Sequence, residues 1–324
     1  MREDWGIAPD GTRVYRLRIG QGGLTAHFLT IGATLQDIRL KGFDFNLVLG
    51  YDRLVPYLTN PAYFGATVGR FANRINQGRA KLDGKTLKLD RNFLGKHHLH
   101  GGRAGSSFRN WKIVSHTFDE IVFRDVLPDG HMGFPGNLTV TVAFRIDETR
   151  TLTSTIEAQT DAPTLCSFTN HNYFNLDGAG DICAHRLCLN SDRYTEVNAE
   201  GIPTGDILSV DHTDYDFRQT RSLGVDGAPV DLDHNFCLEP VSPAAILTSC
   251  RSGIGVRVST TAPGLQVYTG GSIPADTGYL PFAGVALEPQ IWPDAPNHPG
   301  FPSAILRPAE SFRQVTRFAF FSKK

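Results

Sequence analysis

Apolar and polar side chains alternate with a period of two along much of the chain. Residues 138–146 read Leu-Thr-Val-Thr-Val-Ala-Phe-Arg-Ile, and shorter runs of the same kind surround Leu17, Val267 and Phe318. This pattern predicts half-buried β-strands, because successive side chains of a strand point to opposite faces of its sheet. We expect no amphipathic helix of more than about three turns.

Turn residues separate these alternating runs. Asp83-Gly84 joins two of them and predicts a tight β-hairpin, and Ser252-Gly253 predicts a second one. No linker, internal repeat or low-complexity segment divides the chain. We therefore predict one all-β domain over residues 1–324, with large antiparallel sheets stacked as a sandwich. A concave sheet of such a sandwich can point every second side chain into a ligand groove.

Composition narrows the possible partners. The chain has 324 residues, of which 40% are hydrophobic and 20% charged, so it can bury a substantial core. A net charge of −1 without any basic block argues against a nucleic-acid partner and suits a small, neutral, polar ligand. Residues 1–6 do not read as a secretory signal, and no stretch approaches the ~18 apolar residues of a membrane span. We expect a cytoplasmic protein without a membrane partner.

The five cysteines are odd in number and form no CxxC pair. Free thiols in a reducing compartment are therefore expected. A catalytic cysteine stays open as an alternative, although a free cysteine usually behaves as a small core hydrophobe.

Three segments place ionisable side chains among mainly apolar or uncharged polar residues. Glu288 follows the apolar run 282–287, and partial burial there would raise its pKa toward the range of a general base. His171 lies among amides and hydroxyls that can fix its tautomer, which suits proton transfer. His98 and His100 would share one face of a strand. A solvated strand-end Glu288 and a purely structural His171 are the alternatives.

Two other sites are conceivable from these residues, a metal site and a hydrolytic carboxylate pair. The His98/His100 spacing also occurs in metal sites, but Gly101, Gly102, Arg103 and Ala104 follow without a carboxylate, so we predict no metal. Asp231 and Asp233 are two residues apart and could, with Glu288, form the carboxylate pair of a glycoside hydrolase.

A series of longer segments follows in one order from residue 46 to residue 298. They are residues 46–52, 64–75, Leu99-His100-Gly101-Gly102, 169–176, 202–205, 216–218, 233–236, 266–270, and Leu287-Glu288 leading to 293–298. In wording and order they resemble the aldose 1-epimerase (galactose mutarotase) family over nearly the whole chain. The resemblance implies a large antiparallel β-sandwich, the galactose mutarotase-like supersandwich, with a sugar groove on a concave sheet.

The resemblance also implies an isomerase that interconverts the α and β anomers of a free hexose such as galactose or glucose. In it, Glu288 is the general base and His171 the general acid, while His100 and Arg74 hydrogen-bond the reacting end. Asn73, Asp233 and Gln266 are implied as contacts to sugar hydroxyls. No cofactor is expected, because no hydride, electron or phosphoryl group moves. We expect a monomer with a monosaccharide as its partner, and a dimer as the alternative.

The chain departs from the family pattern at Asn172, where a small residue such as Ser is frequent, and at Gly271, where Asn is common. Both bear on sugar preference. The competing functions are a non-catalytic sugar-binding protein on the same fold, the hydrolase or a lyase using Asp233 and Glu288, and a phosphosugar epimerase. The last would need a cationic phosphate pocket, which Arg70, Arg74 and Arg103 do not establish.

Overall fold

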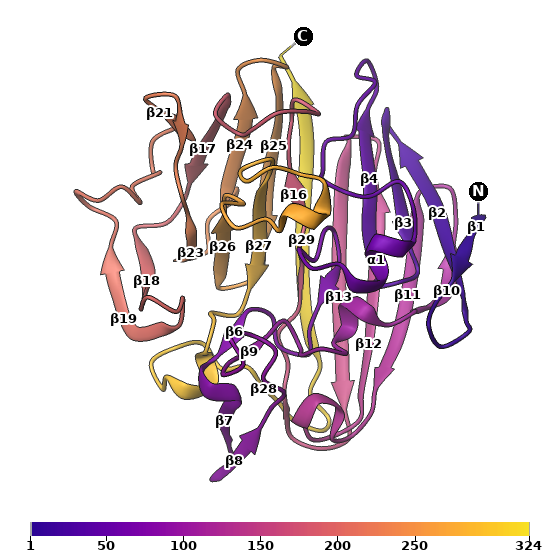
Figure 1. The fold of residues 1–324 in the computed structure, drawn as a ribbon, viewed down its shortest axis with the longest axis vertical. Coiled ribbons are helices and arrows are strands. Elements are labelled where there is room, and N and C mark those ends of the chain that lie inside the picture. The colour runs from indigo at the N-terminus through magenta and orange to yellow at the C-terminus, as the bar shows by residue number, and fades with distance from the viewer. Residues whose placement is uncertain (1, 324) are drawn as a thin grey trace.

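Antiparallel strands are the main secondary structure of the computed structural model, which describes residues 2–323 (Figure 1). The largest sheet has nine strands and includes β29, near the C-terminus, between β13 and β25. Its strands are, in spatial order, β10 (Lys112–His116), β11 (Glu120–Leu127), β12 (Leu138–Ile146), β13 (Thr151–Thr160), β29 (Phe312–Ser322), β25 (Ile254–Thr260), β24 (Ala245–Ser249), β17 (His185–Leu189) and β20 (Arg221–Ser222).

Two smaller sheets cover this large sheet. The six-stranded sheet has the order β16 (Tyr173–Phe174), β27 (Val285–Gln290), β26 (Gly264–Tyr268), β23 (Asp233–Cys237), β18 (Arg193–Val197) and β19 (Pro203–Ser209). The four-stranded sheet runs β1 (Arg2–Ile7), β2 (Arg13–Gln21), β3 (Leu24–Leu29) and β4 (Thr34–Leu40). Figure 1 shows the four-stranded sheet over β10 to β13 and the six-stranded sheet over β24, β25 and β29.

Short elements complete the fold. The two-stranded pairs are β5 (Thr67–Val68) with β15 (Thr169–Asn170), β6 (Arg74–Ile75) with β9 (His98–Leu99), β7 (Arg79–Leu82) with β8 (Lys85–Lys88), β14 (Thr164–Leu165) with β28 (Ile305–Leu306), and β21 (Gly224–Val225) with β22 (Ala228–Pro229). Within residues 2–323 the one α-helix is α1 (Val55–Thr59), and the 3-10 helices are η1 (Asn76–Gly78), η2 (Ser106–Phe108), η3 (His131–Gly133), η4 (Ala275–Thr277) and η5 (Ala295–Asn297). No helix in this part of the chain is long and apolar enough to cross a membrane.

The hydrophobic core lies between the stacked sheets. Phe28 of β3 stacks on Phe144 of β12 with ring centroids 4.3 Å apart, and Phe174 of β16 packs on Phe318 of β29 at 5.5 Å. Each fully buried side chain of this size stabilises the fold by about 1.5–3 kcal/mol, so the alternating strands hold the layers together through their inner faces. The predicted all-β sandwich is confirmed.

Both predicted hairpins are present. Leu82 of β7 pairs with Lys85 of β8 around Asp83 and Gly84, whose φ angles are 47° and 76°. Positive φ at both central residues is the geometry of the turn that matches the twist of paired strands. β24 and β25 form the second hairpin. All five cysteines are free.

Strand β27 differs from the half-buried strands, because every one of its residues is buried. Val285 and Leu287 point into the main core, as expected from alternation. The opposite face carries Glu288, and loops from distant parts of the chain cover it. The site is built on this covered face.

Candidate active site

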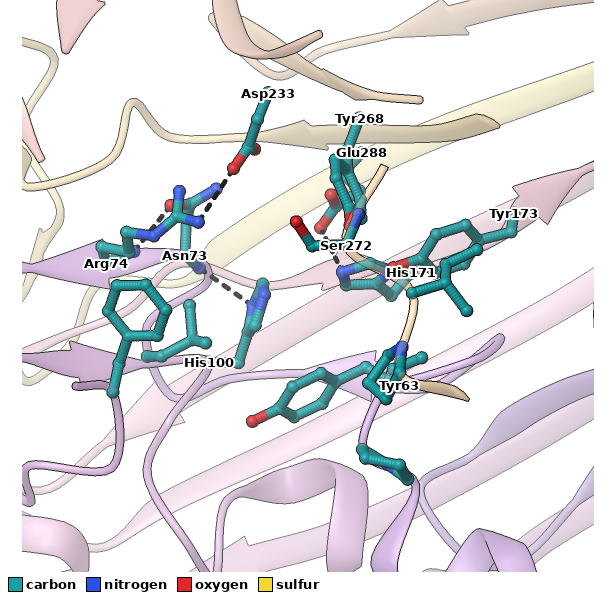
Figure 2. A pocket seen from close by; sticks show the side chains of 16 residues that line it. Tyr63, Asn73, Arg74, His100, His171, Tyr173, Asp233, Tyr268, Ser272 and Glu288 are labelled. Atoms are coloured by element: carbon teal, nitrogen blue, oxygen red, sulfur yellow. Dashed lines mark hydrogen bonds and ion pairs between the residues drawn. The ribbon is translucent and has the colours of Figure 1, made fainter. Parts of the chain in front are cut away.

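A cavity of about 260 Å³ lies on the outer face of the six-stranded sheet (Figure 2). Its walls come from four distant parts of the chain. The lining residues are Pro61, Ala62, Tyr63, Asn73, Arg74, Phe93, Leu99, His100, His171, Tyr173, Asp233, Tyr268, Ser272, Ile273, Pro274 and Glu288. The cavity therefore collects six of the seven residues that the sequence singled out.

Glu288 projects from β27 into this cavity and is only 2% exposed. Gln266 of β26 lies opposite it in the sheet register. Burial raises the pKa of Glu288 well above its usual range, and the negative charge of Asp233 adds to this, while Arg74 opposes it. Among residues 2–323, Glu288 Oε2 has no hydrogen-bond partner. Glu288 is thus a buried carboxyl group whose hydrogen-bonding capacity is left for a ligand, not a solvated strand-end residue.

His171 lies between β15 and β16, and its backbone is bonded on both sides. Its N–H donates to the carbonyl of Ala66, and its carbonyl accepts from Gly65, both at 2.9 Å. The imidazole Nε2 is 3.4 Å from Glu288 Oε2. Burial lowers the pKa of His171 to about 4. Its Nδ1 also lacks a partner, so the ring is not held there as a satisfied structural histidine.

The protonation states of His171 and Glu288 are linked, because a cationic His171 would lower the pKa of Glu288. Burial dominates at both groups and favours the neutral form of each, the carboxylic acid of Glu288 and the uncharged imidazole of His171. One proton serves the pair in either arrangement, on Glu288 or on His171. The 3.4 Å contact is slightly longer than a typical hydrogen bond, and tightening by a few tenths of an ångström on ligand binding would bring the two atoms within reach for proton transfer.

The structure corrects the prediction that His98 and His100 share one strand face. Strand β9 ends at Leu99, and His100 adopts a left-handed backbone with φ 48°. His98 packs its ring on Phe134 at 5.2 Å and bonds the carbonyl of Asp90, whereas His100 faces the cavity. The left-handed residue interrupts the alternation on which the prediction rested.

The tautomer of His100 follows from its backbone partner. His100 Nδ1 is 3.1 Å from the backbone N–H of Asn73, which donates to it. The proton of the neutral ring therefore sits on Nε2, which makes His100 a hydrogen-bond donor toward the cavity. Burial holds its pKa well below the usual value, so the ring stays uncharged.

Ligand atoms of His100, His171 and Glu288 lie within 4.8 Å of one another, which is the arrangement of a possible metal site. The donor set does not fit one. A metal needs the lone pair of His100 Nε2, but the Asn73 N–H occupies Nδ1 and keeps the proton on Nε2. The positive charge of Arg74, which lines the same cavity, opposes a cation as well.

The opposite wall of the cavity carries an ion pair. Arg74 Nη2 is 2.8 Å from Asp233 Oδ2, and Gln266 Nε2 donates to Asp233 Oδ1 at 2.6 Å (Figure 2). Asn73 has φ 65°, and its side-chain oxygen accepts the N–H of Arg74 at 2.8 Å. Gln266 is not among the lining residues and reaches the cavity through Asp233, so its contact to a sugar stays a prediction.

Comparisons with known proteins establish the family of this chain. Residues 13–319 match the aldose 1-epimerase family. The chain is 35% identical to the aldose 1-epimerase of Escherichia coli (strain K12), covering all of both chains, and 37% identical to the galactose mutarotase of Bos taurus, covering 95% of this chain and 94% of the relative. The chain belongs to the aldose 1-epimerase family.

Solved structures of aldose 1-epimerase relatives have the same fold. An aldose epimerase homologue from C. elegans superimposes with a TM-score of 0.90 at 32% identity, covering 95% of this chain and 99% of that one. A galactose 1-epimerase from Lactobacillus acidophilus NCFM gives 0.89 at 28% identity, covering 100% and 99%. The antiparallel sandwich predicted from the family resemblance is thereby confirmed.

Sequence reasoning missed part of this candidate site. Tyr63, Tyr173 and Tyr268 line the cavity, yet only Tyr173 lay in a segment examined for its chemistry. Asp294 was also missed: its N–H donates to the carbonyl of Arg74 at 2.8 Å, and its Oδ1 accepts the N–H of Asn76 at 2.9 Å. Segment 293–298, which resembles the family pattern, was the sequence signal from which these two contacts of Asp294 could have been found.

Proposed function

We propose that this protein is an aldose 1-epimerase, an isomerase that interconverts the α and β anomers of a free hexose such as galactose or glucose. The observation that carries the proposal is the buried contact between His171 Nε2 and Glu288 Oε2 in a cavity sized for one small polar ligand. Opening a hemiacetal requires removal of the proton on O1 and delivery of a proton to the ring oxygen. A paired base and acid meet both needs.

The reaction proceeds without net gain or loss of protons. A sugar hydroxyl donates a hydrogen bond to Oε2 of Glu288. The proton that Glu288 and His171 share then moves from Glu288 to His171. Glu288 then accepts the O1 proton while His171 protonates the ring oxygen, and the bond between C1 and that oxygen breaks. Rotation about C1–C2 presents the other face of the aldehyde, and the same transfers run in reverse.

The burial of the pair favours the ring-opened stage. Once the ring is open, Glu288 is a carboxylic acid and His171 is uncharged, which are the forms that the dry cavity prefers. In this proposal the Nε2–H of His100 and the guanidinium of Arg74 hydrogen-bond the reacting end, and Asn73 and Asp233 bind other hydroxyls. The presence of all four residues in the cavity wall supports these contacts. The steps move only protons, so this chemistry requires no redox cofactor.

The rival functions lack support of this kind. Asp233 is bonded to Arg74 and Gln266, which leaves it less free than Glu288 to act in glycoside cleavage. Arg70 is buried away from the cavity, where it donates to the carbonyls of Leu127 and Gly136, so no phosphate pocket assembles around Arg74. The cytoplasmic location and the monomeric state stay predictions.

Polarimetry of freshly dissolved α-D-galactose and α-D-glucose tests the proposal. The protein should speed the decay of optical rotation to the unchanged endpoint, and a chelator should not alter the rate. The two rates rank the sugars. No acceleration with either sugar, for protein that is folded, would contradict the proposal and favour a sugar-binding role.

A further inference from the structure

Tyr63 stands between the sugar cavity and a second, larger cavity. It lines both, and the second one has a volume of about 630 Å³ and is also lined by Asn92, Phe108 and Arg109. The backbone at Tyr63 has φ 58°, and its N–H donates to the carbonyl of Asn60 at 2.9 Å. This left-handed turn, unusual for a bulky residue, aims the ring at the imidazoles of the site.

The ring of Tyr63 packs on both cavity histidines. It stacks on His171 with centroids 5.9 Å apart and an interplanar angle of 23°, and lies 4.7 Å from His100. Tyr173 stacks on His171 at 5.0 Å and 24°. Figure 2 shows Tyr63 and Tyr173 on opposite sides of the His171 ring. Two flat neighbours fix the plane of the imidazole, so that its Nε2 stays directed at Glu288.

Asn92 lies beside Tyr63. Burial raises the pKa of Tyr63 to about 12, and the neighbouring Asn92 side chain opposes this rise. Asn92 bonds both backbone groups of Leu99, at 2.8 Å to the N–H and 2.9 Å to the carbonyl. Leu99 directly precedes His100 in the chain. One asparagine therefore neighbours the ring that packs on His171 and holds the segment that carries His100.

We propose that Tyr63 is a positioning residue whose ring holds the imidazoles of His171 and His100 and closes their cavity against the neighbouring one. The proposal rests on the mutarotase function only for its catalytic consequence, because the closure can be measured without turnover. The other titratable or charged groups that face His171 or the cavity around it are Glu288, His100, Asp233, Arg74, Tyr173 and Tyr268. Substituting Tyr63 deletes none of these groups, so a change in the His171 titration would report on packing and water access.

The first test is an NMR titration of the labelled histidines in wild type and in Tyr63→Leu. Water entering from the second cavity should move the pKa of His171 from about 4 up toward its unperturbed value of about 6.5. Tyr63→Phe, which keeps the stacked ring, should stay near the wild-type value. An unchanged His171 titration in Tyr63→Leu would overturn the proposal. If that variant does not fold, Tyr63→Met, which retains bulk without a flat ring, gives the same test.

The second test measures kcat and KM by polarimetry in the same variants. Tyr63→Leu should lower kcat by about 10- to 100-fold, since small misplacement of catalytic groups has effects of this size, with a smaller change in KM. Tyr63→Phe should recover most of the loss. Tyr215→Leu is the matched control, because Tyr215 packs on His234 at 4.4 Å and neither lines the cavity. Equal loss in the control would contradict a positioning role. A wild-type protein without mutarotase activity would refute the proposed function. The histidine titration would then decide the positioning role of Tyr63 by itself.

Discussion

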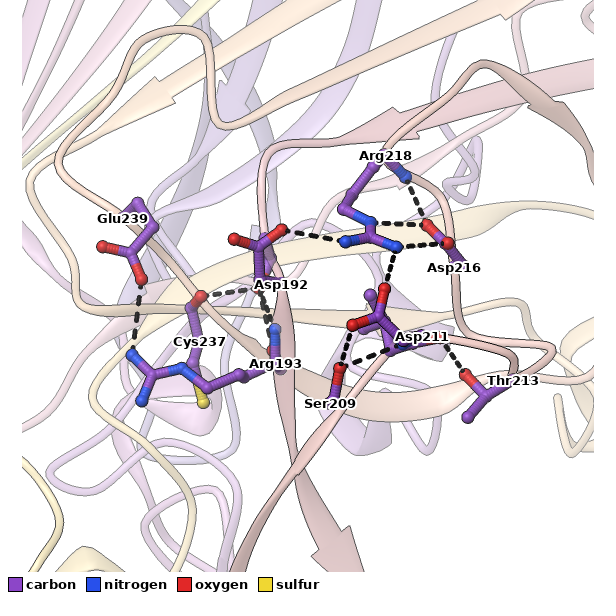
Figure 3. Close-up of polar contacts among 11 residues, drawn as sticks. Asp192, Arg193, Ser209, Asp211, Thr213, Asp216, Arg218, Cys237 and Glu239 are labelled. Atoms are coloured by element: carbon purple, nitrogen blue, oxygen red, sulfur yellow. Dashed lines mark hydrogen bonds and ion pairs between the residues drawn. The ribbon is translucent and has the colours of Figure 1, made fainter.

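The sugar cavity and a cluster around Arg218 both concentrate charged side chains, yet they are built in opposite ways. Arg218 donates to both carboxylate oxygens of Asp216, at 2.9 and 2.7 Å, to Asp192 at 3.4 Å and to Asp211 (Figure 3). Asp192 and Asp211 are exposed, whereas Arg218 and Asp216 are half-buried. Hydrogen bonds from Arg218 lower the pKa of Asp216 to about 2. In the cavity, by contrast, Glu288 has a raised pKa and an acceptor without a partner.

This difference in hydrogen bonding and pKa distinguishes the structural ion pairs around Arg218 from the reactive groups in the cavity. The carboxylates around Arg218 are ionised, solvated and paired, so little would change on meeting a ligand. Glu288 and His171 are dry, uncharged and incompletely bonded, so a sugar that supplies hydrogen bonds also changes which of them holds the proton. The contrast predicts that substitutions in the two regions will differ in activity, in pH dependence and in response to salt.

The largest effect is expected for Glu288→Gln. The amide cannot accept the O1 proton, so the rate should fall by about 10²–10⁴-fold or more while the protein stays folded. Stability should move the other way. Glu288 ionises near its usual pKa in the unfolded chain but resists ionisation when folded, so the wild type loses stability as pH rises above about 4.5. The variant lacks this loss.

Polarimetry and thermal melts at pH 5 and pH 8 check both parts of this prediction. The difference in Tm between Glu288→Gln and wild type should grow in favour of the variant at the higher pH. Near-normal turnover in the variant would remove Glu288 from its role as base.

A smaller effect is expected for Asp233→Asn. Removing this charge leaves Arg74 without its carboxylate partner and weakens a contact to the sugar, so KM should rise about 10-fold, the usual scale for losing a hydrogen bond to a charged group. The negative charge of Asp233 also raises the pKa of Glu288, so that pKa should fall. Infrared titration of the carboxyl band measures it directly. A Glu288 pKa that does not move would show that burial alone sets it.

The smallest effect is expected for Arg218→Met. Neither kcat nor KM should change, because Arg218 is not among the residues that line the cavity. Tm should fall slightly at low salt, and the difference should vanish near 1 M salt, where charges are screened within about 3 Å. The KM effect of Asp233→Asn should persist at that salt, since the Arg74 side chain is only 14% exposed. A large loss of activity in Arg218→Met would break the distinction between the two regions.

The sequence alone was enough to predict the strands and the family. The period of two placed β12 at the residues where the structure has it, and Asp83-Gly84 identified the β7–β8 hairpin. Both signals are local, because alternation and turn conformation depend on neighbouring residues only. Family order likewise pointed to His171 and Glu288, whereas their local surroundings left a structural His171 and a solvated Glu288 open as alternatives.

The tertiary structure decided what those residues are able to do. His171 and Glu288 come within 3.4 Å only because β27 and the segment before β16 meet in the folded chain. The tautomer of His100 depends on a backbone N–H from Asn73, and the enclosure of His171 depends on Tyr63, which no local pattern marked. A pKa is set by the loss of water and by the charges around a group. Those are supplied by distant parts of the chain, so the chemistry of this site is a property of the packing, whereas its strands are a property of the sequence.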